Sequence, residues 1–330
     1  TQVGEEASWL AVIAGTYHSL ALKGEGELWS WGANSDGQLG LGDETDRSTP
    51  EQVGTDADWT LVSAGISHTI ALKADGTLWS WGDNYYGQLG HGDTVSRPTP
   101  EQIGTDADWT ALSVGMYHAL ALKADGTLWS WGHNEYGQLG LGDDDDRSSP
   151  QQIGTDADWV AVAAGNYHSF AIKADGTLWS WGDNEGGQLG LGDQDFRSTP
   201  AQVGTDSDWI AVSGGDLHSL ALKSDGTLWS WGDNYRGQLG SGDATNHFSP
   251  VQVGTDADWV AVAAGNDHSF ALKSDGRLFG WGRNDKGQVG VGDTSDRTVP
   301  TPIGEGTLWS FVIAGRDYSV ALARDGSVWG

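Results

Sequence analysis

The feature that most constrains this chain is a repeat of 50 residues, which runs from Gly4 to Gly304 without an insertion. Its most regular stretch, Ala71 to Gly92, recurs six times with few changes. A fixed period of this kind indicates a repeat architecture, in which each unit buries its apolar face against its neighbours. We therefore interpret residues 1–330 as one domain, with repeats at 1–50, 51–100, 101–150, 151–200, 201–250 and 251–300 and a partial repeat at 301–330.

Each repeat predicts four short antiparallel strands, A to D. In the second copy they are expected at 59–64, 68–73, 77–81 and 99–103, and a glycine-rich loop at 82–97 joins strands C and D. Asp75-Gly76 is typical of a tight two-residue hairpin turn, because this pair tolerates positive φ angles. Trp79 and Trp81 lie two residues apart, so both indoles are expected on one face of strand C.

Four short strands per period predict an all-β fold, a seven-bladed β-propeller of four-stranded antiparallel blades. The A-B-C set occurs seven times, and the chain begins with strand-D residues at Thr1 to Gly4. We expect this N-terminal strand to close the ring by pairing with the C-terminal blade. The chain opens inside a repeat with neither an initiating Met nor a signal peptide, and we interpret it as processed, excised or designed.

Charge and composition exclude several function classes. The formal net charge is -29, which would repel the phosphates of nucleic acids and of anionic lipids, so neither is expected as a partner. The chain has no cysteine, and therefore no disulfide or thiolate site, which leaves the cellular compartment open. No apolar run is long enough to span a membrane. We expect a monomer without a cofactor.

Three linked motifs carry a family resemblance: Gly15 to Leu22, Leu28 to Asn34 and Gly37 to Gly40. They resemble the repeats of the regulator of chromosome condensation family, and the resemblance extends over essentially the whole chain. It implies a seven-bladed propeller. That family includes guanine-nucleotide exchange factors, a plant ultraviolet photoreceptor and plain binding modules. No A-B turn reads Gly-Trp-Arg-His, as the photoreceptor's turns do, and the strict period has no room for the inserted wedge of the exchange factors.

Several repeated polar residues are interpreted as structural. One histidine per repeat is expected to bond backbone groups of its own A-B turn rather than to hold a metal, since tyrosine replaces it in the last copy. Repeated aspartates near the turns, such as Asp56, Asp58 and Asp75, are expected to stabilise turns, because no copy has the spacing of a calcium loop. Asp93 with Arg97, and its counterparts, predict an ion pair that braces the loop. No catalytic constellation is visible, so we expect no enzyme activity.

The copies differ mainly at the A-B turns and in the C-D loops, which antiparallel order places at the same end of every blade. Seven of the eight tyrosines lie at these variable positions, and tyrosine offers a large contact area at low conformational cost. The candidate ligand-binding residues are Tyr17, Tyr85, Tyr86, Met116, Tyr117, Tyr136, Tyr167, Tyr235, Arg236, Arg283, Lys286 and Arg316.

The sequence favours a non-enzymatic interaction scaffold that binds a protein, peptide or glycan through this variable face. Aromatic contacts are expected toward blades one to four and an acidic group of the partner toward blades five to seven. One alternative, implied by the family resemblance, is a guanine-nucleotide exchange factor-like regulator of a small GTPase. Another is a designed or recently amplified repeat protein without a specific ligand.

Overall fold

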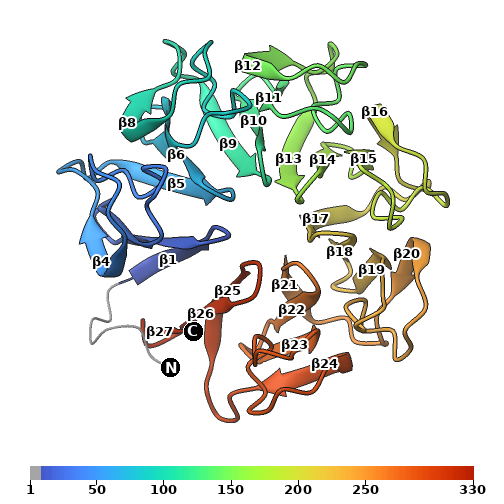
Figure 1. Cartoon of the computed structure of the whole chain (residues 1–330). Helices are drawn as coiled ribbons and strands as arrows, with labels where there is room; N and C mark the ends of the chain where they lie inside the picture. Colours follow the sequence, from blue (N-terminus) through green and yellow to red (C-terminus); the bar gives the residue numbers. More distant parts are fainter. Residues whose placement is uncertain (1–8) are drawn as a thin grey trace.

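A computed structural model describes residues 9–330, which form seven antiparallel sheets placed around a ring (Figure 1). Blades 1 and 2 contain β1 (Trp9–Ala14), β2 (His18–Lys23), β3 (Leu28–Gly32), β4 (Arg47–Gln52), β5 (Trp59–Ala64), β6 (His68–Lys73), β7 (Leu78–Gly82) and β8 (Arg97–Gln102). Blades 3 and 4 contain β9 (Trp109–Val114), β10 (His118–Lys123), β11 (Leu128–Gly132), β12 (Arg147–Gln152), β13 (Trp159–Ala164), β14 (His168–Lys173), β15 (Leu178–Gly182) and β16 (Arg197–Gln202). Blades 5 and 6 contain β17 (Trp209–Gly214), β18 (His218–Lys223), β19 (Leu228–Gly232), β20 (His247–Gln252), β21 (Trp259–Ala264), β22 (His268–Lys273), β23 (Leu278–Gly282) and β24 (Arg297–Ile303). Blade 7 contains β25 (Trp309–Ala314), β26 (Ser319–Ala323) and β27 (Val328–Trp329).

The seven-bladed propeller is confirmed, with four strands in blades 1 to 6 and three described strands in blade 7. The expected closing strand at Thr1 to Gly4 lies outside the described residues. In each blade the strands follow sequence order, and the first lies nearest the ring axis while the fourth lies at the rim (Figure 1). Strands A and B of blade 2 have the predicted bounds. Strand D begins two residues earlier than predicted, because Gly82 pairs with Arg97 across a bulge.

The B-C turn differs from the prediction of a two-residue hairpin. Only Gly76 has a positive φ, of 81°, and no residue other than glycine has one among residues 9–330. The Gly76 amide donates to the Lys73 carbonyl at 3.0 Å, and the Lys73 amide donates to the Thr77 carbonyl at 3.0 Å. This is the three-residue loop that ends in a left-handed glycine. Asp75 stabilises it by accepting bonds from the amide and hydroxyl of Thr77, at 3.0 and 2.7 Å.

Neighbouring blades pack through complementary faces. Between blades 2 and 3, the aliphatic side chains of Ile70, Leu72 and Leu78 contact Trp109 and Trp131 of the next blade. Trp131 is fully buried. An indole buries about 150–250 Å² of surface, which corresponds to about 4–6 kcal/mol at 25 cal/mol per Å². The repeat therefore places one such tryptophan in the core of each boundary from blades 1 and 2 to blades 5 and 6.

A chain of hydrogen bonds crosses the same boundaries and uses the repeated histidine. Between blades 3 and 4, the Ser169 hydroxyl donates to the Gln138 carbonyl at 2.8 Å, so its oxygen accepts from His118 Nε2, which is 2.9 Å away. Trp181 Nε1 donates to the same Gln138 carbonyl at 2.9 Å. We call this set of histidine, hydroxyl, glutamine carbonyl and tryptophan the interblade chain. It satisfies polar groups that are otherwise buried without partners.

Two boundaries depart from the histidine and hydroxyl part of this pattern. Blade 3 carries Ala119 in place of the hydroxyl residue, and His68 Nε2 is consequently buried without a hydrogen-bond partner among the described residues. At the boundary of blades 7 and 1, Tyr318 replaces the histidine. Its hydroxyl lies 2.9 Å from the Gly15 carbonyl and 2.8 Å from the His18 carbonyl, so the longer side chain reaches the backbone of blade 1.

We predict that Ala119→Ser stabilises the protein. The new hydroxyl would accept from His68 Nε2 and donate to the Gln88 carbonyl, which should raise the free energy of unfolding by about 1 kcal/mol. Urea titrations of the wild type and the variant measure the difference. The matched control is Ala121→Ser in the same strand, where the hydroxyl would enter an apolar cluster and should lower the free energy of unfolding. A loss of stability in both variants would contradict the assignment.

Candidate binding face

The A-B turns and C-D loops lie at one end of the blades and are joined to each other by backbone hydrogen bonds. In blade 2 the Asp83 amide donates to the Ser67 carbonyl at 2.8 Å. Around the axis, the Ile66 amide donates to the Met116 carbonyl at 3.2 Å, and the Met116 amide to the Asn166 carbonyl at 3.1 Å. Bonds of this kind tie the turns of blades 1 to 5 each to the next blade. The variable side chains are therefore carried by a connected backbone.

Seven aromatic side chains form a continuous row across blades 2 to 4, which we call the aromatic strip. Ring centroids of successive members lie 4.4 to 6.4 Å apart. These distances suit edge-to-face contacts. Five members are tyrosines that the sequence singled out, and two were not predicted. The strip consists of Tyr85, Tyr86, Tyr117, His133, Tyr136, Tyr167 and Phe196.

Some side chains of the strip are exposed, and others are half-buried. Tyr85 and Phe196 at its ends are 73% and 51% exposed, whereas Tyr117 and Tyr167 are half-buried. Burial raises the pKa of Tyr167 to about 12, with further contributions from the neighbouring tyrosines. The Tyr167 phenol therefore stays neutral at physiological pH. The strip offers aromatic surface with hydroxyl groups at fixed places.

Two carboxyl groups, the buried Asp183 and the half-buried Asp216, bond to the loops and turns that carry the strip. Asp183 accepts the Glu185 amide at 3.0 Å and Gln188 Nε2 at 2.9 Å, and burial raises its pKa above the ordinary value. Asp216 accepts Asn166 Nδ2 at 2.7 Å, and its pKa is likewise raised by burial. These bonds hold the loop backbone in place. The aspartates are consequently supports for the aromatic side chains.

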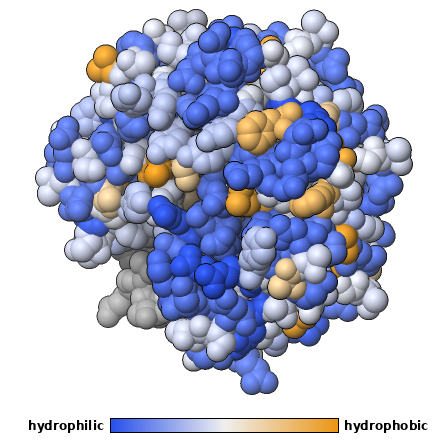
Figure 2. Space-filling view, turned by 45° about the vertical axis from the view of Figure 1, so that its right-hand side comes forward, coloured by the Kyte–Doolittle hydropathy of each residue, from blue (hydrophilic) through white to orange (hydrophobic). Residues whose placement is uncertain are grey.

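The other candidate aromatic residues lie apart from the strip. The Tyr17 hydroxyl accepts a hydrogen bond from Arg316 Nη1 at 3.0 Å, which joins blades 1 and 7. Tyr235 is 78% exposed and makes no ring contact with another described aromatic residue. The structure therefore brings five of the seven candidate tyrosines together. Apolar side chains on one side of the molecule lie in small separate patches on a mostly hydrophilic surface (Figure 2).

The candidate basic residues form ion pairs with carboxylates that were not among the candidates from the sequence. Lys286 Nζ lies 2.8 Å from Asp317, and Arg283 lies 3.7 Å from the same carboxylate. Arg283 also contacts Asp285 at 2.8 Å and Asp267 at 3.4 Å, and Arg236 lies 3.5 Å from Asp296. Their positive charge is thus largely compensated within the face. An acidic group of a partner would have to compete with these carboxylates.

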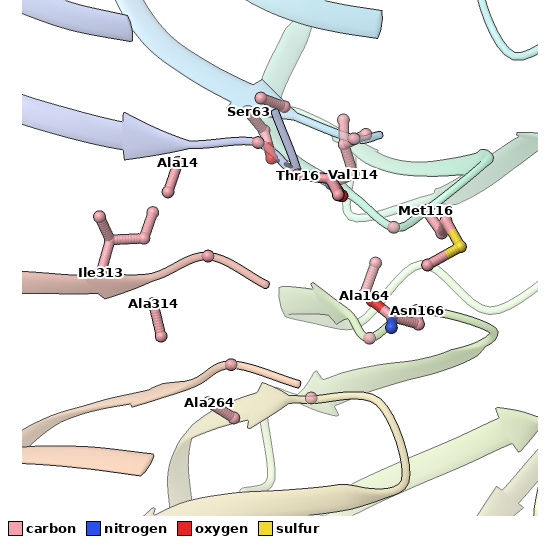
Figure 3. A pocket seen from close by; sticks show the side chains of 18 of the residues that line it. Ala14, Thr16, Ser63, Val114, Met116, Ala164, Asn166, Ala264, Ile313 and Ala314 are labelled. Carbon is pink, nitrogen blue, oxygen red and sulfur yellow. Dashed lines mark hydrogen bonds between the residues drawn. The ribbon is translucent and has the colours of Figure 1, made fainter. Parts of the chain in front are cut away.

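A cavity of about 220 Å³ lies on the ring axis and is lined by the first strand of each blade. Its walls carry small side chains such as Ala14, Ser63 and Ala164, and Figure 3 shows Met116 and Asn166 at one end of it. Asn166 Nδ2 also lies 3.3 Å from Asn266 Oδ1. Met116, a candidate ligand-binding residue, therefore lies at this cavity rather than in the aromatic strip.

The comparisons with known proteins agree with this geometry. The sequence pattern of the regulator of chromosome condensation (RCC1) repeat matches residues 25–72 and 75–122, and a second pattern of the same repeat matches 11–38, 59–88 and 109–138. An RCC1-like domain pattern matches residues 148–303. The chain belongs to the RCC1 repeat family. The resemblance noted in the sequence is thereby confirmed.

Solved structures superpose on nearly the whole chain. Human WBSCR16 is 25% identical, with a TM-score of 0.88, and the alignment covers 98% of this chain and 88% of that one. Yeast RCC1 (Prp20), crystallised bound to Kap60, is 26% identical, with a TM-score of 0.86 and coverage of 98% and 82%. The ultraviolet-B receptor UVR8 of Arabidopsis thaliana is 49% identical over 41 residues, which are 12% of this chain and 9% of the receptor.

The repeated aspartates of this RCC1-type chain stabilise turns and ion pairs at the opposite ends of the blades. Lys73 Nζ lies 2.5 Å from Asp56 and 3.1 Å from Asp58, and it also lies 4.7 Å from the centroid of the Trp59 ring. The loop-bracing pair is present too, with Arg97 at 3.0 Å from Asp93. Residues 9–330 contain no group of histidine and carboxylate side chains placed to hold a metal ion. Among the same residues, no helix is long and apolar enough to cross a membrane.

The repeated histidines were expected to bond backbone groups of their own turns, and this detail is wrong. In the structure Nε2 reaches a serine or threonine hydroxyl of the next blade, as His118 does with Ser169 at 2.9 Å. The imidazole is fully buried, and burial lowers the pKa of His118 to about 3. Each such ring is therefore neutral at physiological pH. Their role is to connect blades.

We predict an acid-induced loss of stability from these histidines. Because their pKa values fall from 6.5 to about 3 or 4 on folding, the unfolded chain binds protons that the folded chain excludes below pH 6.5. Each contributes stability that is complete above pH 6.5 and decreases by about 1.4 kcal/mol per pH unit below it. Urea titrations between pH 7 and pH 4.5 should show this decrease. His118→Gln should reduce the slope of the unfolding free energy against pH by about the contribution of one histidine. An unchanged slope would contradict the assignment.

Proposed function

We propose that this protein is a non-enzymatic interaction module that binds a partner through the face carrying the A-B turns and C-D loops, with the aromatic strip as the main contact. The observation that carries the proposal is the continuity of the strip, whose seven rings come from turns and loops of blades 2, 3 and 4. Aromatic side chains at fixed positions contribute large contact area with little loss of conformational entropy.

The hydrogen bonds that fix the backbone of the strip favour a role in recognition over neutral sequence variation among exposed loop residues. Tyr86 and Tyr136 are both partly buried, and the backbone of each is fixed by a glutamine, at 2.8 Å from Gln88 Oε1 and 2.9 Å from Gln138 Oε1. Preformed binding surfaces of this kind need little reorganisation when a partner docks. A protein, a peptide or a glycan could each use aromatic rings edged with hydroxyl groups. The ion-paired basic residues of blades 5 to 7 form a secondary contact region.

Relatives support a protein as the partner. Prp20p of Saccharomyces cerevisiae, which is 26% identical over 98% of this chain, binds Gsp1p and histones. Guanine-nucleotide exchange therefore stays an alternative function. The strict 50-residue period, which leaves no space for an inserted wedge, favours plain binding over exchange.

We predict that Tyr85→Ser, Tyr86→Ser, Tyr117→Ser and Tyr136→Ser in one variant abolish binding, because they remove most of the aromatic strip. The measurement is a comparison of what the wild type and this variant retain from lysate and medium of the source organism. A retained species is then purified, and its dissociation constant is determined for both proteins. We expect the affinity to fall at least 100-fold, since each lost aromatic contact at the centre of an interface typically costs more than about 1 kcal/mol.

The matched control changes Asp56, Asp58 and Asp75 to Asn at the opposite ends of the blades. This variant should bind as the wild type does. Circular dichroism of both variants verifies that the propeller remains folded. Loss of binding in the aspartate variant, with retention in the tyrosine variant, would place the site on the opposite face.

A further inference from the structure

The cavity on the ring axis reaches the A-B turns, and its volume is about 220 Å³. This is below the range of about 300–1,000 Å³ that is usual for drug-sized ligands, so the cavity suits a smaller molecule. In each blade one residue follows the last glycine before the A-B turn, and its identity varies. Five of these residues line the cavity, namely Thr16, Met116, Asn166, Asn266 and Arg316. The axial cavity therefore carries different chemical groups on different sides.

Hydrogen bonds fix the orientation of the two asparagines. The Asp216 carboxylate accepts from Asn166 Nδ2 at 2.7 Å, and the same nitrogen lies 3.3 Å from Asn266 Oδ1. Each side-chain amide has one end that donates and one end that accepts. Asn166 Oδ1 is therefore left as an acceptor, and Asn266 Nδ2 as a donor, without a hydrogen-bond partner within residues 9–330.

Blades 6, 7 and 1 place donors on one side of the axial cavity. Arg316 Nη1 donates to the Tyr17 hydroxyl at 3.0 Å, and Arg316 Nε lies 3.9 Å from Asp317, which is beyond hydrogen-bond distance. Because a guanidinium has five N–H groups, several remain available. Thr16 adds a hydroxyl group that has no hydrogen-bond partner in the described part of the chain. With Asn266 Nδ2, these donors suit a carboxylate.

Blades 3 to 5 provide an acceptor and an apolar side chain. Asp216 lies behind Asn166 rather than in the cavity lining, so its negative charge favours a cation at Asn166 Oδ1. Burial raises the pKa of Asp216, while the hydrogen bond from Asn166 and the charge of Arg316 lower it. Met116 is adjacent to Asn166, since its amide donates to the Asn166 carbonyl at 3.1 Å (Figure 3). A ligand that meets all these groups needs an anionic, a cationic and an apolar part.

We propose that the axial cavity binds a free α-amino acid with an apolar side chain. The carboxylate of the ligand would accept from Arg316, Asn266 and Thr16. Its ammonium would donate to Asn166 Oδ1, and its side chain would pack against Met116. Such a zwitterion has no net charge, so the protein's charge of -29 does not repel it. Three different contacts around one carbon atom also distinguish the two enantiomers. The site does not use the aromatic strip and adds small-molecule binding to the proposed function.

The test uses the fact that Met116 is the single methionine of the chain and lines the axial cavity. Protein that carries a ¹³C-labelled methionine methyl group is titrated with L-leucine and with D-leucine, and the one methyl resonance is followed by NMR. We expect a saturable shift with a dissociation constant below about 1 mM for one enantiomer, and weaker binding of the other. Absence of a shift with both enantiomers at about 10 mM would overturn the proposal.

Two leucine analogues test the charged groups of the ligand. Isocaproate lacks the ammonium group and isoamylamine lacks the carboxylate, while both keep the apolar chain. Each should bind at least about 10-fold more weakly than the preferred leucine enantiomer, because each loses a hydrogen bond of a charged group. If isocaproate binds as well as leucine, the cavity is a simple carboxylate site and the amino-acid assignment is wrong.

Two protein variants test the contacts. Arg316→Gln removes the guanidinium and should weaken leucine binding about 10- to 100-fold, whereas the matched control Arg277→Gln, at an exposed B-C turn, should leave the affinity unchanged. Asp216→Asn removes the charge behind Asn166 and should weaken binding of leucine without weakening that of isocaproate. Its control is Asp195→Asn at an exposed loop position. Circular dichroism verifies the fold of each variant. Equal effects of the variants and their controls would contradict the site.

Discussion

The structure depends on the interblade chain, in which a buried histidine, a hydroxyl, a glutamine carbonyl and a tryptophan join blade 1 to blade 2 and blades 3 to 6 to one another. Apolar packing alone would hold two blades together without fixing their relative position, because burial is not directional. The hydrogen bonds add direction, and their low-dielectric surroundings make a missing partner costly. They also explain the glycine that stands three residues before the histidine in the repeat. A Cβ atom on Gly115 would lie 2.3 Å from His118 Cε1, so glycine is required beside the ring.

Because the interblade chain uses residues of strands and of one loop position, the remaining turn and loop positions are free to differ between copies. The tyrosines of blades 2 to 4 occupy such positions, and their rings meet only because backbone bonds fix one turn against the next. Stability and recognition are thus assigned to different residues of the same repeat. The seventh blade is the exception, since Tyr318 replaces the histidine and bonds the backbone of blade 1 directly.

The period and the strand pattern were sufficient to predict the propeller, because strand length and turn residues are local properties. The register between copies is not local, and the sequence therefore did not show that His118 meets Ser169, 51 residues away. The Asp75-Gly76 turn was assigned too few residues, since a left-handed glycine also ends a three-residue loop. His133 and Phe196 were missed because the aromatic candidates were all tyrosines. The carboxylates around Asp317 were missed because they come from different loops.

The interblade chain holds the ring together, whereas the exposed aromatic face contributes little to its stability. The most direct measurement is the free energy of unfolding of two variants, Ser169→Ala and the double variant Tyr85→Ser with Phe196→Ser. The first leaves His118 Nε2 without an acceptor and should lose about 1–3 kcal/mol. The second changes exposed side chains and should stay within about 0.5 kcal/mol of the wild type. Equal losses, or a larger loss in the double variant, would contradict the account.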